Sequence, residues 1–168
     1  MENESFEMGR VAGIILAAGV ASRMGQPKQL LPWKGEALIR HAVHAALTAF
    51  LSPVVVVTGA RAEQIAEAVS DLNVKIIYNP AWADGQSTSV RAGISSLPGD
   101  VQAALFLLAD QPYVSAELIR ALKEAYFAGR PPVLATYVAE KRTNPVLFDR
   151  STFADLCQLQ GDAGARSI

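Results

Sequence analysis

A small-residue turn followed by two basic residues is the part of the sequence with the clearest chemical use. The turn comes at the end of an apolar run at residues 11–17. Residues 16–28 have the sequence Leu-Ala-Ala-Gly-Val-Ala-Ser-Arg-Met-Gly-Gln-Pro-Lys. Small residues let the backbone bend sharply and let a ligand approach it, and unpaired N–H groups in such a turn form an anion site. Arg23 adds a forked donor and Lys28 a compact charge. The segment predicts a triphosphate site, because reaction at the α-phosphorus needs cations near the bridging oxygens.

This turn differs from the common phosphate-binding motifs. It is not Gly-x-x-x-x-Gly-Lys-Ser/Thr, which argues against a P-loop. It also lacks Gly-x-Gly-x-x-Gly, which argues against a dinucleotide fingerprint. The structural alternative is a strand-to-helix turn with two solvated cations. The position of Arg23 and Lys28 directly after the first strand favours the binding role.

A lone carboxylate, Asp110, follows the apolar run at residues 103–109. An acid at the end of a buried strand is poorly placed for a core and well placed for a hard cation. Mg²⁺ is usually held by one or two carboxylates together with substrate phosphates and water. By residue type alone, a capping or turn aspartate before Pro112 is equally consistent.

A third candidate segment, residues 79–93, joins an apolar run to a helical pattern. Gly85 permits close approach of a ligand, and Ser89 is one of three hydroxyl residues at the helix start that are able to read a pyrimidine edge. The alternative is an ordinary hydroxyl cap of the helix. His41 and His44 stand three residues apart without an acidic or Cys partner, so we expect a structural pair and not a metal site.

The elements that must position these residues follow from periodicity. Leu, Ile, Val and Ala runs predict strands, and stripes at helical spacing predict helices between them. The expected strands span residues 11–17, 54–58, 74–78, 103–109, 133–138 and 145–148, the last two around a turn at 140–142. The expected helices span residues 37–50, 61–69, 87–97, 116–127 with Ser115 as cap, and a last one capped by Ser151 and reaching residue 159.

The strand sequences predict a parallel sheet. Residues 54–57 and 105–108 do not alternate apolar with polar, so both faces of these strands are covered. Strand–helix alternation then gives a doubly wound α/β fold with a mostly parallel sheet and helices on both faces. Ligands bind beyond the carboxyl ends of such strands. We therefore expect Lys28 and Asp110 to face one cleft, and the hypothesis fails if they lie on opposite sides of the sheet.

Composition limits the classes of function. The chain has 168 residues, 51% of them hydrophobic and 18% charged, with a net charge of −1. These values predict one domain at residues 11–168 after a flexible tail at residues 1–10, and they argue against nucleic acid or an anionic membrane as partner. Cys157 is the single cysteine and fits a small core residue. Without a leader or an apolar span, we expect a cytoplasmic protein.

Several segments together resemble the nucleotidyltransferases with a MobA-like fold. Residues 16–28 resemble their signature loop, although Ala21 stands where many members carry Ser or Gly. The Leu-Ala-Asp-Gln-Pro around Asp110 matches a motif whose aspartate binds the metal. Residues 79–93 resemble the base-pocket segment. Residues 142–148 and 161–166 resemble segments toward the acceptor side in the branch similar to molybdenum cofactor cytidylyltransferase, with Thr143 in place of the usual Gly.

The resemblance implies that CMP passes from CTP to the phosphate of a molybdopterin-type acceptor, with Mg²⁺ as cofactor. The Ala-Ala pair at residues 17–18 leans toward CTP, since guanylyl-transferring relatives typically carry Ala-Gly-Gly there. The implied catalytic residues are Arg23, Lys28 and the metal ligand Asp110. The implied substrate-binding residues are Leu16, Ala17, Ala18, Gly19, Ser22, Arg23, Gly25, Lys28, Gly85, Ser89, Arg142, Asn144 and Arg166.

Other functions remain open on the sequence. Within the same class, the acceptor could be a sugar phosphate or polyol phosphate. A non-catalytic carrier or maturation partner of a molybdoenzyme is a second alternative. The family usually continues beyond Gly-Ala-Arg to a second metal carboxylate, and we expect this chain to lack that segment, which favours a carrier. An NAD-binding oxidoreductase is a third alternative that lacks its glycine fingerprint.

Overall fold

The centre of the fold is a six-stranded mixed sheet. The computed structural model describes residues 9–20, 22–23 and 25–162, with the backbone alone at residues 22 and 23. The sheet order is β7-β6-β1-β8-β10-β9, in which β1, β6, β7 and β8 are parallel and β10 runs antiparallel to both β8 and β9. The strands are β1 (Arg10–Ala17), β6 (Val54–Thr58), β7 (Lys75–Tyr78), β8 (Val101–Leu108), β9 (Val133–Val138) and β10 (Lys141–Asp149). The predicted mostly parallel α/β fold is confirmed.

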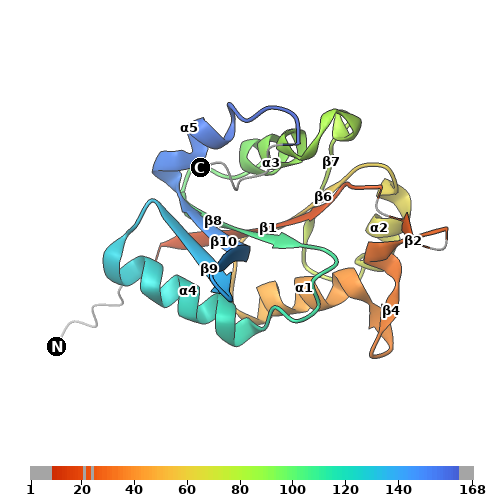
Figure 1. The fold of residues 1–168 in the computed structure, drawn as a ribbon, viewed down its shortest axis with the longest axis horizontal. Helices are drawn as coiled ribbons and strands as arrows, with labels where there is room; N and C mark the ends of the chain where they lie inside the picture. The colour runs from red at the N-terminus through yellow and green to blue at the C-terminus, as the bar shows by residue number, and fades with distance from the viewer. Residues whose placement is uncertain (1–8, 21, 24, 163–168) are drawn as a thin grey trace.

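Helices cover both faces of this sheet (Figure 1). The helices α1 (Leu38–Thr48), α2 (Ala62–Ala68) and α4 (Ala116–Gly129) bury residues in one core cluster. The helices α3 (Gln86–Ser95) and α5 (Phe153–Leu156) bury theirs in the cluster on the other face. The β2 and β4 segments lie at one end of the sheet, on the right of Figure 1.

Strand β1 shows why the sequence gives two cores. Ile14 and Ile15 are both fully buried, yet successive side chains of a strand point to opposite faces. Ile14 belongs to the cluster of Val90 and Phe106, whereas Ile15 belongs to the cluster of Val43. An uninterrupted apolar run is therefore the pattern that a central strand needs.

The ends of several elements test the sequence predictions. Ser115 caps α4 as predicted, since its side chain accepts a hydrogen bond from the Leu118 N–H at 3.2 Å. The prediction of a last helix capped by Ser151 and reaching residue 159 was wrong in its bounds and cap. A 3₁₀ turn at Arg150–Thr152 comes first, and α5 ends at Leu156. The reason is Asp149, whose carboxylate accepts from the Ser151 N–H at 2.8 Å and so takes the capping role.

The β9–β10 turn is also shifted from its prediction at residues 140–142. Strand β10 already begins at Lys141, which leaves Ala139 and Glu140 to make the turn. Both have positive φ, 48° and 64°, as a tight two-residue hairpin requires. In the part of the chain that is described, no helix has the length and apolar character to cross a membrane.

Candidate functional site

The parallel pairing of β1 and β8 places two predicted site segments at one sheet edge. Leu16 is in register with Leu108, and the Ala109 N–H donates to the Leu16 carbonyl at 3.2 Å. The chain leaves both strands immediately afterwards, toward Gly19 from β1 and toward Asp110 from β8. The two segments therefore meet because parallel strands end on the same side of the sheet.

Lys28 reaches Asp110 at this edge. Its Nζ lies 3.7 Å from Oδ2 of Asp110, and each of the two side chains is 34% exposed. The cation and the acid thus lie on the same side of the sheet, and Asp110, but not Lys28, is among the residues that line the cavity described below. A partly exposed ion pair of this kind contributes little to stability.

A short hairpin and a 3₁₀ turn carry Lys28 to that position. Strands β2 (Ser22–Arg23) and β3 (Gln26–Pro27) pair antiparallel, and Gly25 supplies the positive φ of 80° at their turn. The 3₁₀ turn η1 (Lys28–Leu30) follows directly. Its middle residue, Gln29, is only 7% exposed and donates its side-chain amide to the Gly19 carbonyl at 3.2 Å. Gln29 thus ties the lysine-bearing turn to the loop after β1.

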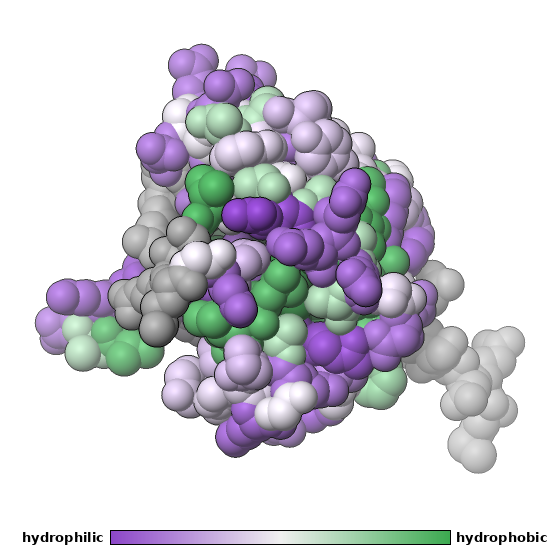
Figure 2. Space-filling model, turned by 90° about the vertical axis from the view of Figure 1, so that its right-hand side faces the viewer, coloured by the Kyte–Doolittle hydropathy of each residue, from purple (hydrophilic) through white to green (hydrophobic). Residues whose placement is uncertain are grey.

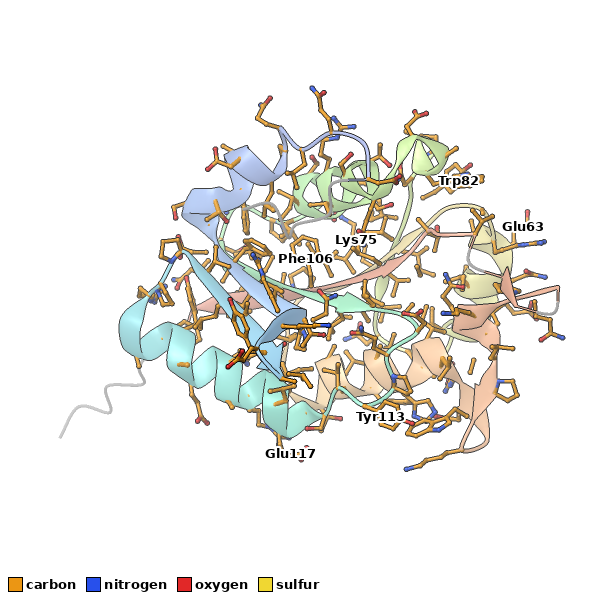
Figure 3. The ribbon with its side chains drawn as sticks, viewed as in Figure 1. Glu63, Lys75, Trp82, Phe106, Tyr113 and Glu117 are labelled. Carbon is orange, nitrogen blue, oxygen red and sulfur yellow. The ribbon has the colours of Figure 1, made fainter. Side chains whose placement is uncertain are left out.

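A cavity of about 420 Å³ opens between these segments. Figure 2 shows this face of the molecule, on which patches of apolar residues are surrounded by polar ones. The predicted residues that line the cavity are Leu16, Ala18, Gly19, Gly85, Ser89 and Asp110. Sequence reasoning did not select the other lining residues, which include Gln29, Trp82 and Asp162. Figure 3 shows Trp82 near this end of the sheet, on the side of α3.

A buried asparagine organises the serine-rich wall of the cavity. Asn79 is buried and donates to the hydroxyls of Thr88 at 2.8 Å and Ser89 at 3.0 Å, while its carbonyl oxygen accepts from the Ala81 N–H. Thr88 also reaches the Gly85 carbonyl at 2.8 Å. Thr88 is therefore held by the fold, and Ser89 alone of these hydroxyl residues lines the cavity.

Gly85 packs closely against Gly161 at the same wall of the cavity. Its φ is 111°, and a methyl group on it would overlap the carbonyl of Gly161. The Gly161 carbonyl also accepts a hydrogen bond from the Ser87 N–H at 3.1 Å. This packing brings residues 161–162 back over the start of α3, which is how Asp162 comes to line the cavity.

The other predicted site residues either do not line this cavity or lie outside the residues that the structure describes. Ala17 is buried in the core, and Gly25 lies at the turn between β2 and β3, so neither lines the cavity. Arg142 lies on β10, and Asn144 lines a second cavity that also includes Asp110. Three predicted contacts lie outside the described residues: the side chains of Ser22 and Arg23, and all of Arg166.

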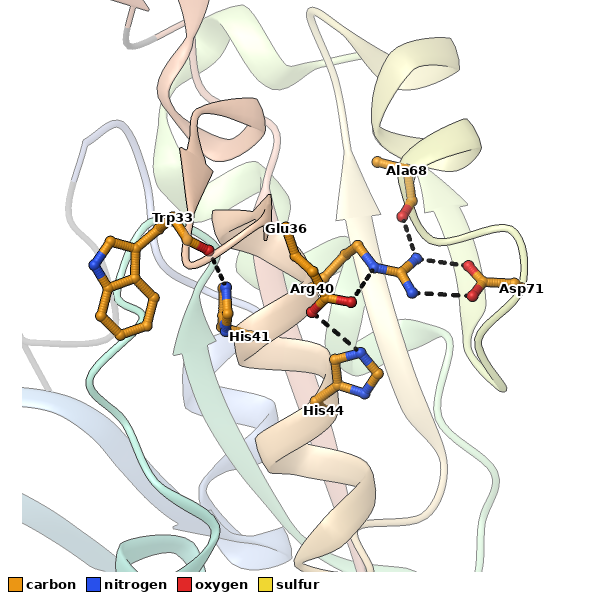
Figure 4. A network of polar contacts seen from close by, with 7 residues as sticks. All are labelled: Trp33, Glu36, Arg40, His41, His44, Ala68 and Asp71. Atoms are coloured by element: carbon orange, nitrogen blue, oxygen red, sulfur yellow. Dashed lines mark hydrogen bonds and ion pairs between the residues drawn. The ribbon is translucent and has the colours of Figure 1, made fainter.

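The two histidines of α1 belong to a polar network that holds the hairpin of β4 (Pro32–Trp33) and β5 (Glu36–Ala37) (Figure 4). His41 Nε2 lies 2.8 Å from the Trp33 carbonyl, and His44 Nε2 lies 3.7 Å from a Glu36 oxygen. Among the described residues, no three His, Cys, Asp or Glu side chains gather as metal ligands. Glu36 is thus an acidic neighbour of His44 that the sequence analysis did not expect, and both histidines contact the β4–β5 hairpin.

The residues of the cavity fit a divalent cation that is shared with a substrate. Asp110 and Asp162 both line it, and carboxylates are the protein ligands that Mg²⁺ and Mn²⁺ prefer. Because the described part of the chain holds no group of three ligands, phosphate oxygens and water would have to complete the coordination.

Comparison with known proteins agrees with this geometry. Nicotine blue oxidoreductase of Paenarthrobacter nicotinovorans is 30% identical over 163 residues, which cover 93% of this chain and 79% of that protein. Molybdenum cofactor cytidylyltransferase of Escherichia coli K12 is 33% identical over 114 residues, which cover 67% of this chain and only 58% of that protein. The crystal structure of Rv0371c from Mycobacterium tuberculosis H37Rv has the same fold, with a TM-score of 0.85, 22% identity and coverage of 95% and 82%.

The match to a protein family covers most of the chain. Residues 13–168 match the MobA-like NTP transferase domain, which includes both the loop after β1 and the Asp110 segment. The chain therefore belongs to the MobA-like NTP transferase family of nucleotidyltransferases.

Proposed function

We propose that the chain transfers CMP from CTP to the phosphate of a molybdopterin-type acceptor in the cytoplasm. The observation that carries this proposal is the approach of Lys28 Nζ to within 3.7 Å of Asp110, a residue that lines the 420 Å³ cavity beside the loop after β1. A nucleotidyltransferase needs a cation and a metal-binding acid on the same polyphosphate. The cytidylyltransferase named among the relatives supports the choice of nucleotide and acceptor.

The proposed reaction is a direct in-line displacement. An oxygen of the acceptor phosphate attacks the α-phosphorus, the bond from that phosphorus to the bridging oxygen breaks, and pyrophosphate leaves. The acceptor phosphate is already ionised at neutral pH, so the protein supplies positioning and charge neutralisation. Lys28 would stabilise the α-phosphate, and Arg23 is assigned the β- and γ-phosphates on its sequence position.

A divalent cation would be held by Asp110, and Asp162 is the other carboxylate residue that lines the cavity among the described residues. When bound, Mg²⁺ would neutralise the phosphate oxygens as charge shifts to pyrophosphate. Gly19 and its neighbours would offer backbone N–H groups. Ser89 would face the nucleotide, since its hydroxyl is fixed by Asn79 at the cavity wall.

The proposal is tested by pyrophosphate release with the purified protein. CTP, Mg²⁺ and molybdopterin should give turnover, and GTP should give far less. Lys28→Ala should abolish turnover, whereas Lys75→Ala, which removes the same charge on the exposed edge strand β7, should not.

Tighter binding of GTP than CTP with Mg²⁺ present would refute the cytosine assignment. Turnover with sugar phosphates but not molybdopterin would reassign the acceptor, and CTP binding without turnover would favour a carrier.

A redox function is the second candidate, because a relative named as an oxidoreductase aligns with 93% of the chain. The loop after β1 does not contain the glycine fingerprint of dinucleotide-binding folds. Titration with NADH and NADPH separates the two functions. Saturable binding of either, together with no pyrophosphate release from CTP, would favour the redox alternative.

A further inference from the structure

A pair of aromatic rings makes a second contact between the two segments that carry Lys28 and Asp110. Trp33 follows Lys28 by five residues, in the hairpin of β4 and β5. Tyr113 follows Asp110 by three residues, in the loop after β8. The two ring centroids lie 5.3 Å apart at an interplanar angle of 68°, which is an attractive edge-to-face arrangement. The ring contact and the ion pair therefore join the same two short segments at both ends, so each limits how far the other can open.

Trp33 is fixed on helix α1. His41 of that helix packs edge-on against the indole ring, with centroids 4.8 Å apart, and its Nε2 lies 2.8 Å from the Trp33 carbonyl oxygen (Figure 4). The other strand of the hairpin is held by the same helix, since Arg40 and His44 approach the carboxylate of Glu36 to 3.5 and 3.7 Å. The hairpin is therefore a rigid platform that presents the indole ring to the loop after β8.

The loop after β8 has much less anchoring of its own. None of its residues 110–115, all of which are described, is buried, and Tyr113 is 83% exposed. Val114 packs against the core only at the end of the loop that leads into α4. Segments with few buried contacts are the parts of a fold that open most easily. The Asp110 end of the loop is therefore held to the neighbouring segment by the ion pair and by the contact of Tyr113 with Trp33.

Both segments are stiff between their two contacts. Pro32 and Pro112 stand immediately before the two aromatic residues, and a proline ring fixes its own φ at about −65°. The Leu31 N–H also donates to the Lys28 carbonyl at 3.1 Å and closes the 3₁₀ turn. A displacement of the Tyr113 ring would therefore be passed along a short, stiff backbone to Asp110.

We propose that Trp33 is a positioning residue, which acts through Tyr113 to hold Asp110 opposite Lys28. Trp33 lines neither of the two cavities that include Asp110, so its effect does not need contact with a ligand. This inference rests on the proposed transferase function, to which it adds a residue outside the nucleotide cavity. Misplacement of a reacting group by about 1 Å can slow a reaction roughly 100-fold, so a contact that sets the separation of the lysine and the acid affects the chemistry.

Calorimetric titration of the full chain with CTP, with and without Mn²⁺ and without any acceptor, tests the positioning role. Tyr113→Leu removes the ring contact at an exposed position, so the urea midpoint should stay unchanged. Its affinity for CTP with Mn²⁺ should fall roughly tenfold, as expected for loss of one aromatic contact, while the affinity without metal stays the same. Trp33→Leu should show the same loss, and Tyr113→Phe, which keeps the ring, should bind as the wild type does. Tyr78→Leu, which removes an exposed tyrosine from β7, is the control and should change neither affinity.

The double variant Trp33→Leu/Tyr113→Leu shows whether the two residues act through their contact. Its loss of metal-dependent affinity should equal that of either single variant, because one contact can be removed only once. Additive losses, or wild-type affinity in Tyr113→Leu, overturn the positioning role.

Pyrophosphate release separates this inference from the proposed function. If the single variants lose metal-dependent affinity while the wild type releases no pyrophosphate from CTP with molybdopterin, the positioning role stands and the transferase function fails. If the wild type turns over and Tyr113→Leu leaves both kcat and metal-dependent affinity unchanged, the function stands and Trp33 has no positioning role.

Discussion

The side-chain amide of Gln29 donates to the backbone carbonyl of Gly19 over 3.2 Å and so joins the turn that carries Lys28 to the loop after β1. The remaining amide oxygen of Gln29 is buried without a hydrogen-bond partner in the described structure, and the residue lines the 420 Å³ cavity. One buried residue therefore connects the lysine-bearing turn to the loop beside the cavity. The position of Lys28 depends on the hydrogen bond between Gln29 and Gly19 as well as on the ion pair between Lys28 and Asp110.

Gln29→Leu keeps the side-chain volume but removes the bond to Gly19. We expect a weaker affinity for CTP and only a small change in the free energy of unfolding, because loss of the hydrogen bond, worth about 1 kcal/mol, is offset by removal of the buried unpaired oxygen. Urea unfolding and calorimetric titration with CTP measure the two effects. Gln64→Leu on the exposed face of α2 is the matched control. Unchanged CTP affinity in Gln29→Leu would show that the tie does not position the loop.

Asp110→Asn removes the charge of the proposed metal ligand without changing its shape. We expect nucleotide affinity in the presence of Mg²⁺ or Mn²⁺ to fall roughly 10- to 100-fold, the range seen when groups that support a bound metal are removed. Binding of CTP without metal should change little. Calorimetric titration with and without the metal makes the comparison. Asp155 is an exposed acid in α5, and Asp155→Asn should retain the metal dependence of CTP binding. Loss of this metal dependence in both variants would contradict the assignment of Asp110 as the metal ligand.

Gly85→Ala should damage both stability and nucleotide binding. The backbone there has φ of 111°, and the added methyl group would meet the Gly161 carbonyl. Strained backbone of this kind costs about 1–3 kcal/mol, and relief by moving residues 161–162 would deform the cavity wall. Urea unfolding measures the loss. Gly99→Ala is the control, because a methyl group there meets only open space, and equal stability of the two variants would refute the packing argument.

The ion pair between Arg40 and Asp71 predicts a specific loss of stability in acid (Figure 4). Arg40 donates to both carboxylate oxygens, at 2.6 and 2.9 Å, and this hydrogen bonding lowers the pKa of Asp71 from 3.8 to about 2. Because the folded pKa lies below the unfolded one, the contribution is present above the unfolded pKa. It is lost as the pH falls through the folded value.

Urea midpoints measured between about pH 6 and pH 2 check this contribution. Asp71→Asn should lower the midpoint at the upper end of that range and flatten its decline in acid. Asp155→Asn, in α5, is the control for removal of an exposed acid elsewhere in the chain, since Asp71 lies in the turn after α2. If Asp71→Asn retained the full slope of the wild type, the pair with Arg40 would not be the source of the acid sensitivity.

Sequence periodicity located the central elements well because a buried parallel strand must be apolar throughout. The range Val54–Thr58 was predicted to the residue, and it is buried along its whole length. The ends of helices were less predictable where two neighbouring residues could each act as the N-cap. Asp149 and Ser151 are both good capping residues, and only the end of β10 at Asp149 decided that Asp149 accepts the hydrogen bond.

The sequence alone determined the family, the mostly parallel sheet, and the residue types that can neutralise a polyphosphate, because these depend on local order along the chain. Only the tertiary structure decided which of them meet. The register of β1 with β8 brought Lys28 to Asp110, and the close approach of Gly85 and Gly161 brought Asp162 to the cavity. It also gathered Tyr113 and Tyr137 around a second cavity, since contacts between distant segments follow from packing and leave no periodic trace in the sequence.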